Sequence, residues 1–174
     1  MKLWRCQICG DPYLGEERPK NCPFCGAHER YMVLQSDFDN RIGKVEGLSE
    51  TSKANLEAAL ELEIDNTRFY ACAARKSAED EARNLFKTLS KIESEHASVI
   101  SKALGIPKPP IEEADICTGD YQKNLAESHR REERAIRRYG QFLSEAEEPR
   151  VQEIFSALVA IESDHLSLSE ERMR

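Results

Sequence analysis

Two short stretches of the chain repeat a pair of side chains that can bind a metal ion. Glu93 and His96 lie three residues apart, and Glu162 and His165 repeat this spacing further along the chain. On a helix, residues three apart project from the same face about one turn apart. Carboxylate and imidazole groups both bind divalent transition metals. The two stretches therefore predict two related halves of one metal site.

The repeat extends well beyond these pairs, at a constant step of 69 residues. At this step Glu63 becomes Glu132 and Tyr70 becomes Tyr139. Apolar positions follow the same rule, since Phe86, Leu89 and Ile92 become Phe155, Leu158 and Ile161. A constant register over two helix lengths indicates a duplicated helical hairpin. Each hairpin carries one lone glutamate on its first helix and one Glu-x-x-His on its second.

A second group of potential ligands lies near the amino terminus. Two Cys-x-x-Cys pairs, each followed by glycine, are separated by twelve residues; they contain Cys6, Cys9, Cys22 and Cys25. Glycine permits the positive φ with which each turn can close under a metal ion. Four thiolates in tetrahedral geometry suit zinc or a single iron. On the cysteines alone we favour zinc, in a ribbon that only holds its shape.

Composition excludes several classes of function. The chain has 174 residues and a net charge of −7, with acidic and basic residues interspersed. This charge argues against nucleic acid or an anionic membrane as a partner. No apolar run approaches the roughly 18 residues of a membrane span, and the first residues lack the apolar segment of a signal peptide. We therefore expect a cytoplasmic protein.

Glycine and proline residues that end helices, together with helical periodicity, divide the chain into units. We expect a four-cysteine metal-binding domain at 1–35, a polar linker at 36–49 and a four-helix bundle at 50–174. The first unit is too short to fold on an apolar core alone, so its metal must contribute to stability. Helical periodicity begins near Glu50, and Gly105 ends the second helix. The third helix begins near Asp120, and Pro149 suits the first turn of the fourth.

The segment 105–119 contains three prolines and cannot be helical. Extended, it reaches about 50 Å at ~3.3 Å per residue. A helix of roughly 27 residues is about 40 Å long, so the segment can cross the whole bundle. The third helix would then run parallel to the second. This predicts a mainly α fold, the ferritin-like four-helix bundle with one long crossover.

The helical stripes place the two lone glutamates, Glu63 and Glu132, on inward faces. With the two Glu-x-x-His pairs, four carboxylates and two imidazoles then meet at one level. Buried charge is costly unless it is paired, and two divalent metals would neutralise all four carboxylates. Glutamates from two helices and Glu-x-x-His from two others form the di-iron or di-manganese site of carboxylate bundles. The alternative is a satisfied polar layer or a set of surface ion pairs.

Six residues outside the ligand set need an interpretation of their own: two tyrosines, two histidines and two cysteines. Tyr70 and Tyr139 lie two turns from Glu63 and Glu132, and either hydrogen-bond a ligand carboxylate on the opposite helix or form aromatic core. His129 lies on the inward stripe, where we expect a satisfied core histidine. His28 follows the second cysteine pair and should be exposed. Cys72 and Cys117 lie off the ligand stripes, and we expect a packed thiol and a loop thiol.

With these motifs the chain resembles the rubrerythrins over nearly its whole length. Both cysteine pairs look like their short rubredoxin-type domain, and the glutamate and histidine pattern looks like their di-iron domain. The cysteine module comes first, as in "reverse" rubrerythrins. The resemblance implies one iron in the cysteine site and two in the bundle. It also implies reduction of hydrogen peroxide to water, an electron-donor protein, and a homodimer or larger assembly in which the cysteine site often approaches the partner's di-iron site.

The sequence departs from the family pattern mainly at one position, and the spacing of the third-helix tyrosine, Tyr139, also differs by one residue. Rubrerythrins commonly have a seventh ligand, a glutamate one turn after the ligand on the third helix, and Ala135 occupies that position here. The six remaining ligands resemble those of bacterioferritin. Reduction of dioxygen and oxidation of ferrous iron therefore stay open beside peroxide reduction, as does manganese in place of iron. A further alternative is a zinc-ribbon helical module that only binds a partner protein.

Overall fold

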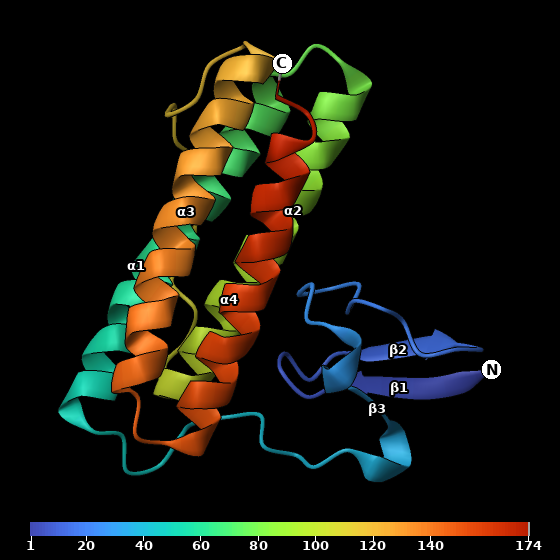
Figure 1. Cartoon of the computed structure of the whole chain (residues 1–174), viewed down its shortest axis with the longest axis vertical. Helices are drawn as coiled ribbons and strands as arrows, with labels where there is room; N and C mark the ends of the chain where they lie inside the picture. Colours follow the sequence, from blue (N-terminus) through green and yellow to red (C-terminus); the bar gives the residue numbers. More distant parts are fainter. Residues whose placement is uncertain (174) are drawn as a thin grey trace.

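The structure, a computed structural model, describes residues 1–173 and consists of four long helices beside a small sheet (Figure 1). The helices are α1 (Glu50–Lys76), α2 (Asp80–Leu104), α3 (Tyr121–Glu145) and α4 (Pro149–Glu170). None of the helices within the described residues is long and apolar enough to cross a membrane. The predicted four-helix bundle is confirmed, and its helix ends lie close to the expected positions.

Local signals in the sequence explain where the helices begin and end. The Ser49 side chain accepts a hydrogen bond from the Ser52 amide at 3.1 Å, which caps α1, and Asp120 caps α3 in the same way. Such caps satisfy amides that have no partner inside the helix. Gly105 ends α2 with φ +70°, a conformation that costs glycine little.

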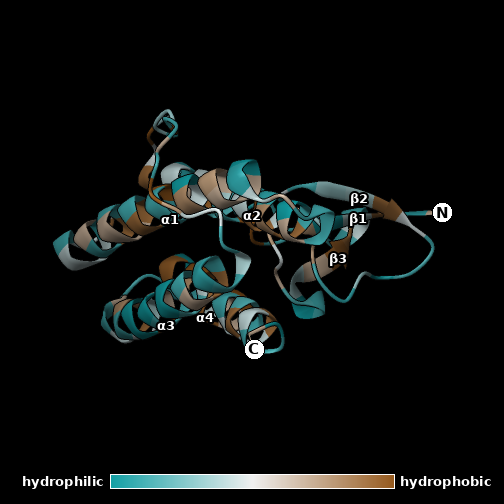
Figure 2. Ribbon diagram, turned by 90° about the horizontal axis from the view of Figure 1, so that it is seen from above, coloured by the Kyte–Doolittle hydropathy of each residue, from teal (hydrophilic) through white to brown (hydrophobic). Residues whose placement is uncertain are grey.

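The bundle has two layers joined by a long crossover. Figure 2 shows α1 and α2 as one layer and α3 and α4 as the other. The segment 105–120 runs from the end of α2 back along the bundle to the start of α3, so these two helices point the same way (Figure 1). This is the ferritin-like topology that the length of the segment predicted.

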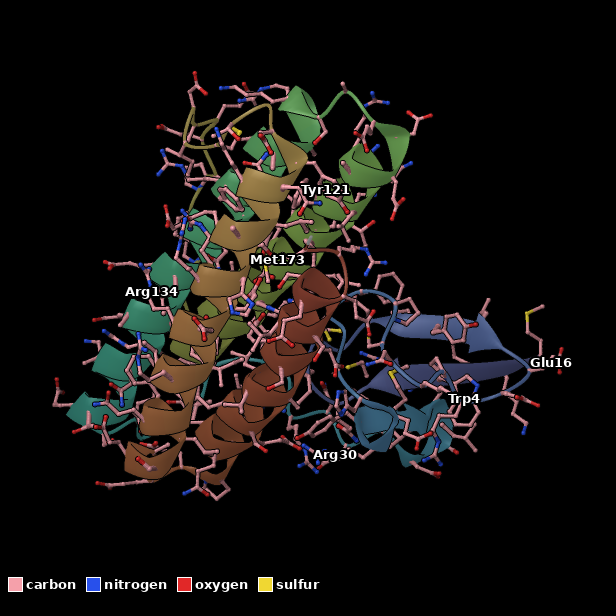
Figure 3. All side chains as sticks on the ribbon, turned by 45° about the horizontal axis from the view of Figure 1, so that its top comes forward. Trp4, Glu16, Arg30, Tyr121, Arg134 and Met173 are labelled. Carbon is pink, nitrogen blue, oxygen red and sulfur yellow. A yellow bond between two sulfur atoms is a disulfide. The ribbon has the colours of Figure 1, made fainter. Side chains whose placement is uncertain are left out.

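The amino-terminal module is a three-stranded antiparallel sheet that carries the cysteines in its turns. Its strands are β1 (Lys2–Cys6), β2 (Pro12–Gly15) and β3 (Met32–Leu34), in the order β2-β1-β3. Trp4 in β1 and Glu16 just after β2 lie well away from the end of the bundle at Tyr121 (Figure 3). The module packs beside one end of α2 and α4 (Figure 1).

Two apolar clusters leave a polar layer between them in the middle of the bundle. One includes Leu56, Tyr139, Phe155 and Leu158, and the other includes Phe69, Tyr70, Phe86 and Leu125. On each helix the candidate ligands lie between the residues of the two clusters. Tight packing on both sides restricts the rotamers of the ligand side chains.

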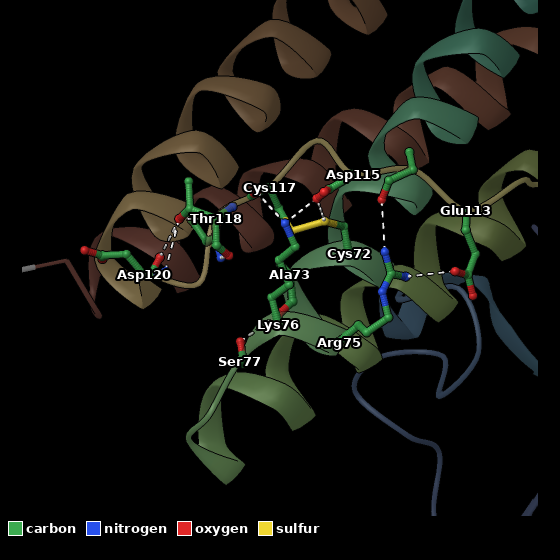
Figure 4. Close-up of a disulfide and its surroundings, with 12 residues drawn as sticks. Cys72, Ala73, Arg75, Lys76, Ser77, Glu113, Asp115, Cys117, Thr118 and Asp120 are labelled. Atoms are coloured by element: carbon green, nitrogen blue, oxygen red, sulfur yellow. Dashed lines mark hydrogen bonds and ion pairs between the residues drawn. A yellow bond between two sulfur atoms is a disulfide. The ribbon is translucent and has the colours of Figure 1, made fainter.

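The structure contradicts one expectation about the remaining cysteines. Cys72 on α1 and Cys117 in the crossover form a disulfide (Figure 4), so they are not two separate thiols. They are 45 residues apart in sequence, and only the path of the crossover over α1 brings them together. Neither residue carries a local signal for this pairing.

Candidate metal centre

The six predicted ligands meet in the polar layer at the centre of the bundle. They form two overlapping groups whose ligand atoms lie within 4.8 Å of one another. The first group is Glu63, Glu93, His96 and Glu162, and the second is Glu93, Glu132, Glu162 and His165. Glu93 and Glu162 belong to both groups, whereas each of the other four belongs to one. This pattern provides two candidate metal positions that share the carboxylates of Glu93 and Glu162.

The imidazoles point their Nδ1 atoms at these carboxylates. His96 Nδ1 lies 3.4 Å from Glu93 and 3.2 Å from Glu162, and His165 Nδ1 lies 3.2 Å from Glu93 and 2.8 Å from Glu162. The carboxylates and His96 are fully buried, and His165 is 6% exposed. The site is therefore closed to all but small molecules.

Most ligand atoms at this centre have no hydrogen-bond partner among the described residues. These buried atoms are Glu63 Oε2, both carboxylate oxygens of Glu93, His96 Nδ1, Glu132 Oε2 and Glu162 Oε1. Unpartnered buried polar atoms are costly, and buried charges are normally paired or bind metals. Two divalent cations would use all of these atoms at once. The donor set thus fits a pair of metal ions.

The pKa values show how the metal-free centre shares its protons. Burial raises the pKa of Glu63 and Glu132 well above the usual range. Burial alone would lower the pKa of His96 and His165, but the facing carboxylates raise both well above the usual value. Burial also opposes ionisation of Glu93, yet the facing imidazoles of both histidines, 3.2 and 3.4 Å away, lower its pKa. Metal ions would displace the protons held on the histidines and the outer glutamates.

A hydrogen bond fixes the tautomer of one ligand. His96 Nε2 donates to the Cys25 carbonyl oxygen at 2.8 Å. With the proton on Nε2, the lone pair of Nδ1 in the neutral ring points into the metal centre. Backbone carbonyls commonly orient metal-binding histidines in this way. The contact also joins a ligand of the bundle directly to one of the four cysteines, within a single chain.

The two buried tyrosines hydrogen-bond ligand carboxylates across the bundle. Tyr70 on α1 donates to Glu132 on α3, and Tyr139 on α3 donates to Glu63 on α1 at 2.6 Å. Of the two interpretations of these residues, the structure supports the hydrogen bond to the opposite helix. Within residues 1–173, Tyr70 has a further partner, Ser128, at 2.8 Å, and Tyr139 has none. The repeat places Ala59 opposite Ser128, so the sequence contained this asymmetry but gave no reason to notice it.

The four cysteines form a buried cluster in the amino-terminal module. Cys6 Sγ and Cys25 Sγ lie 3.7 Å apart, and Cys9 Sγ and Cys22 Sγ lie 3.8 Å apart. A tetrahedral metal with bonds of about 2.3 Å requires sulfurs about 3.8 Å apart. The Ile8 amide also lies 3.4 Å from Cys6 Sγ, where it favours the thiolate. The cluster has the dimensions of a single-metal site.

Several contacts hold this module against the bundle, and sequence analysis did not identify them. Arg150 Nη1 and Nη2 on α4 donate to the carbonyl oxygens of Gln7 and Ile8, both at 2.8 Å. A methyl group on Gly26 would lie 3.1 Å from Ile161, so glycine permits close approach here. These contacts keep the Cys25 carbonyl on His96.

Comparisons with known proteins agree with this geometry. The rubrerythrin family model matches residues 54–168, and the rubredoxin-like domain of rubrerythrin matches residues 4–32. The chain belongs to the rubrerythrin family. It is similar to "Reverse rubrerythrin-1" of Clostridium acetobutylicum, with 30% identity over 114 residues. That alignment covers 60% of this chain and 63% of the relative.

Three residues differ from what the family pattern or the sequence analysis predicted for them. Ala135, at the position of the family's seventh ligand, is buried. His28 is less exposed than expected, because Nε2 contacts Asp164 at 2.7 Å across the seam between module and bundle. His129 is not a satisfied core residue, since its side chain is 23% exposed and its Nδ1 lacks a hydrogen-bond partner in the described chain.

Proposed function

We propose that this chain is a non-haem di-iron oxidoreductase that reduces hydrogen peroxide to water and thereby protects against oxidative stress. Electrons would pass through an iron held by the four cysteines. The observation that carries the proposal is the set of unpartnered ligand atoms in the bundle, joined through His96 to Cys25. Family membership supports it, since rubrerythrins are generally peroxidases.

The donor atoms suit iron in both places, with zinc as an alternative in the cysteine site and manganese in the bundle. In the bundle, one ion would be held by Glu63, Glu93, His96 and Glu162, and the other by Glu93, Glu132, Glu162 and His165. A pair of ferrous ions would supply the two electrons that reduction of hydrogen peroxide to water requires. Glutamates can change their binding mode as the charge of the site changes, and the tyrosines restrict this movement through their hydrogen bonds.

The burial of the centre favours a very small substrate. No ligand carboxylate is exposed, and only His165 has any solvent-accessible surface. Hydrogen peroxide and dioxygen are small enough to enter through a narrow or transient opening. The apolar clusters on both sides exclude bulk water. Reactive products are thereby kept away from the rest of the chain.

The Cys25–His96 contact supplies a short route between the two metal sites. The Cys25 carbonyl belongs to a cysteine that would bind the single iron, and His96 Nδ1 would bind one of the pair. Electrons can therefore pass from thiolate to imidazole through one residue and one hydrogen bond. We extend the proposal to an external electron-donor protein, and to a homodimer or larger assembly. Phe24, 42% exposed beside Cys25, offers an apolar contact for such a donor.

The test is rapid mixing of the reduced, iron-loaded protein with hydrogen peroxide in the absence of oxygen. We expect about three irons per chain, rapid oxidation of the bundle, and slower return of the red colour of the ferric cysteine site. The matched control, Glu132→Ala, should keep the colour but lose the rapid reaction. Oxidation no faster than that of free ferrous iron would overturn the proposal. One zinc per chain with no metal in the bundle would instead support the binding module.

Ala135 favours a second candidate function, the oxidation of ferrous iron. Without a seventh ligand, the set of six is symmetric under the repeat and resembles that of bacterioferritin. Ferrous iron added in excess with dioxygen distinguishes the two functions. Continued turnover with ferric iron accumulating in the protein would indicate iron oxidation. A reaction limited to the bound ions would indicate a peroxidase or oxidase.

A further inference from the structure

The disulfide between Cys72 and Cys117 joins α1 to the crossover, and its two cysteines differ in burial (Figure 4). Cys72 is fully buried on α1, whereas Cys117 in the crossover is partly exposed. Cys117 also lines a groove of about 360 Å³ between the crossover and α3, which Cys72 does not line. Thiol–disulfide exchange requires a thiolate to reach one of the sulfurs. Of these two cysteines, Cys117 alone lines the groove, so we take its sulfur as the one that an external thiolate attacks.

The groove has the charge to hold an anion next to that sulfur. Lys123 lies on its wall and is exposed. Within the part of the chain that the structure describes, its ammonium group makes no ion pair or hydrogen bond. Arg130 lies on the same wall, where Glu127 pairs with it at 2.6 Å. Lys123 therefore leaves one uncompensated positive charge in the groove, which favours a small thiol that carries an anionic group.

The crossover stays attached on both sides of Cys117 without the disulfide. Its polar contacts to the helices are Arg75 with the Ala114 carbonyl at 3.1 Å, Lys76 with Asp115, and Asn124 with the Thr118 carbonyl at 2.9 Å. Reduction of the disulfide would leave these contacts in place. The two sulfurs would then remain close together, and the bond could form again. This local attachment makes reversible chemistry compatible with a stable fold.

We propose that Cys72 and Cys117 form a reversible thiol–disulfide site that reacts with small anionic thiols in this groove. The external thiolate attacks Cys117 Sγ, the Cys72–Cys117 bond breaks, and its electron pair leaves on Cys72 Sγ, which takes a proton from water. A second external thiolate attacks the sulfur of the first external thiol, releasing the external disulfide and the Cys117 thiolate. Asp115 Oδ1 lies 4.0 Å from Cys72 Sγ and can accept a weak hydrogen bond from the new thiol.

Hydrogen peroxide closes the site again. The Cys117 thiolate attacks one peroxide oxygen, the O–O bond breaks, and the hydroxide that leaves becomes water. The Cys72 sulfur, losing its proton, attacks Cys117 sulfenic acid and displaces a second hydroxide, which also becomes water. Two thiols and one peroxide thus give one disulfide and two waters. Peroxide would form the covalent link between the crossover and α1, and small thiols would break that link while the polar contacts of the crossover stay in place.

The site does not depend on the proposed metal chemistry, so we test it on zinc-loaded full-length protein, in which the bound metals are redox-inactive. The protein is treated with 2-mercaptoethanesulfonate, which is anionic, or 2-mercaptoethanol, which is neutral, and peptides are mapped after alkylation. We expect mixed disulfides on Cys117 and none on Cys72. One equivalent of peroxide should then remove both free thiols from the reduced protein.

The charge of the groove provides the matched control. Lys123→Gln should slow the reaction with the sulfonate thiol several-fold and leave the reaction with the neutral thiol unchanged. Lys87→Gln, an exposed lysine on α2, should change neither rate. Reduction only at the rate of global unfolding, adducts on Cys72, equal effects of Lys123→Gln on both thiols, or failure of peroxide to reclose the bond would each overturn the proposal. Any of these results would leave the peroxide reaction of iron-loaded protein unaffected.

Discussion

The His96 half of the metal centre is covered by the cysteine module, whereas the His165 half has no such cover. His96 is fully buried and its Nε2 donates to the Cys25 carbonyl. His165 retains 6% exposure, and its Nε2 makes no hydrogen bond within the described residues. The two halves have the same ligands because the chain is duplicated. Their surroundings differ because one module and a few side chains break the duplication.

This difference in cover suggests that the two candidate metal positions have different roles. The His96 position would lie on the proposed electron route from the cysteine site. Among the six candidate ligands, His165 alone keeps a small solvent-accessible surface, 6%, so small molecules would approach its position more easily. The tyrosines show a similar asymmetry, since Ser128 supports Tyr70 and the repeat places Ala59 at the position facing Tyr139.

The largest effect should come from removing a ligand that both halves share. Glu93→Ala deletes a bridging carboxylate and should abolish binding of both metals in the bundle. Glu132→Ala deletes a ligand of the His165 half alone and should leave at most one weakly held ion. Metal content per chain, measured after anaerobic loading and desalting with the cysteine site as internal reference, distinguishes the two. Two bound ions in Glu93→Ala would contradict the bridging geometry.

A second substitution should weaken the docking of the cysteine module over the His96 half without changing a candidate ligand. Arg150→Ala removes two hydrogen bonds from α4 to the module. At about 1.5 kcal/mol for each bond from a charged donor, the docked arrangement loses much of its stability. We expect three irons per chain but a return of electrons to the bundle that is slower by at least about tenfold, or ~1.4 kcal/mol.

The control for this substitution is Arg83→Ala, because Arg83 forms an exposed ion pair within α2. It should leave electron transfer unchanged, as measured by rapid-mixing absorbance of the cysteine site. If Arg150→Ala transfers electrons at the normal rate, docking of the module on its own bundle is not what sets that rate. The covered and open halves would then be equivalent in function.

Sequence patterns predicted which side chains meet at the centre of the bundle but not what covers them. Helical periodicity and the 69-residue repeat fix which faces point inward, so Glu63 and Glu132 could be identified from spacing alone. The partner of His96 is the backbone carbonyl of Cys25, which no side-chain pattern can predict. The contact exists only after the module docks on the bundle. The partnership of Cys72 and Cys117 likewise depends on the path of a crossover that has no periodicity. Local rules therefore predict the bundle, and contacts between distant segments decide how its two halves differ.

A pH titration of the metal-free protein tests whether the halves are equivalent before metal binds. The pKa values of Glu63, Glu132, His96 and His165 are raised in the folded chain. The folded chain therefore holds more protons than the unfolded chain above the unfolded values, and its stability falls as pH rises. The slope is about 1.4 kcal/mol per pH unit for each extra proton.

We expect the melting temperature of the metal-free protein to fall from about pH 4.5 upward, where unfolded glutamates lose their protons, and more steeply above about pH 6.5, where unfolded histidines do so. Glu63→Gln and Glu132→Gln should each make this slope shallower, and by the same amount if the halves are equivalent. Metal-loaded protein should not lose stability in this range, because metal affinity rises as ligands lose protons. A metal-free protein that becomes more stable between pH 6.5 and 9 would show that the raised pKa values are wrong.

The smallest effect should come from exchanging the residues that support the tyrosines. Ser128→Ala removes one partner of Tyr70 and should lower stability by about 0.5–1.5 kcal/mol. Ala59→Ser offers Tyr139 the partner that Tyr70 already has. If these hydrogen bonds make the metal positions inequivalent, either substitution should bring the Mössbauer signals of the two irons closer together. Signals that remain as far apart as in the unchanged protein would assign the asymmetry to the Cys25 contact with His96 instead, because that contact is the difference that both substitutions leave intact.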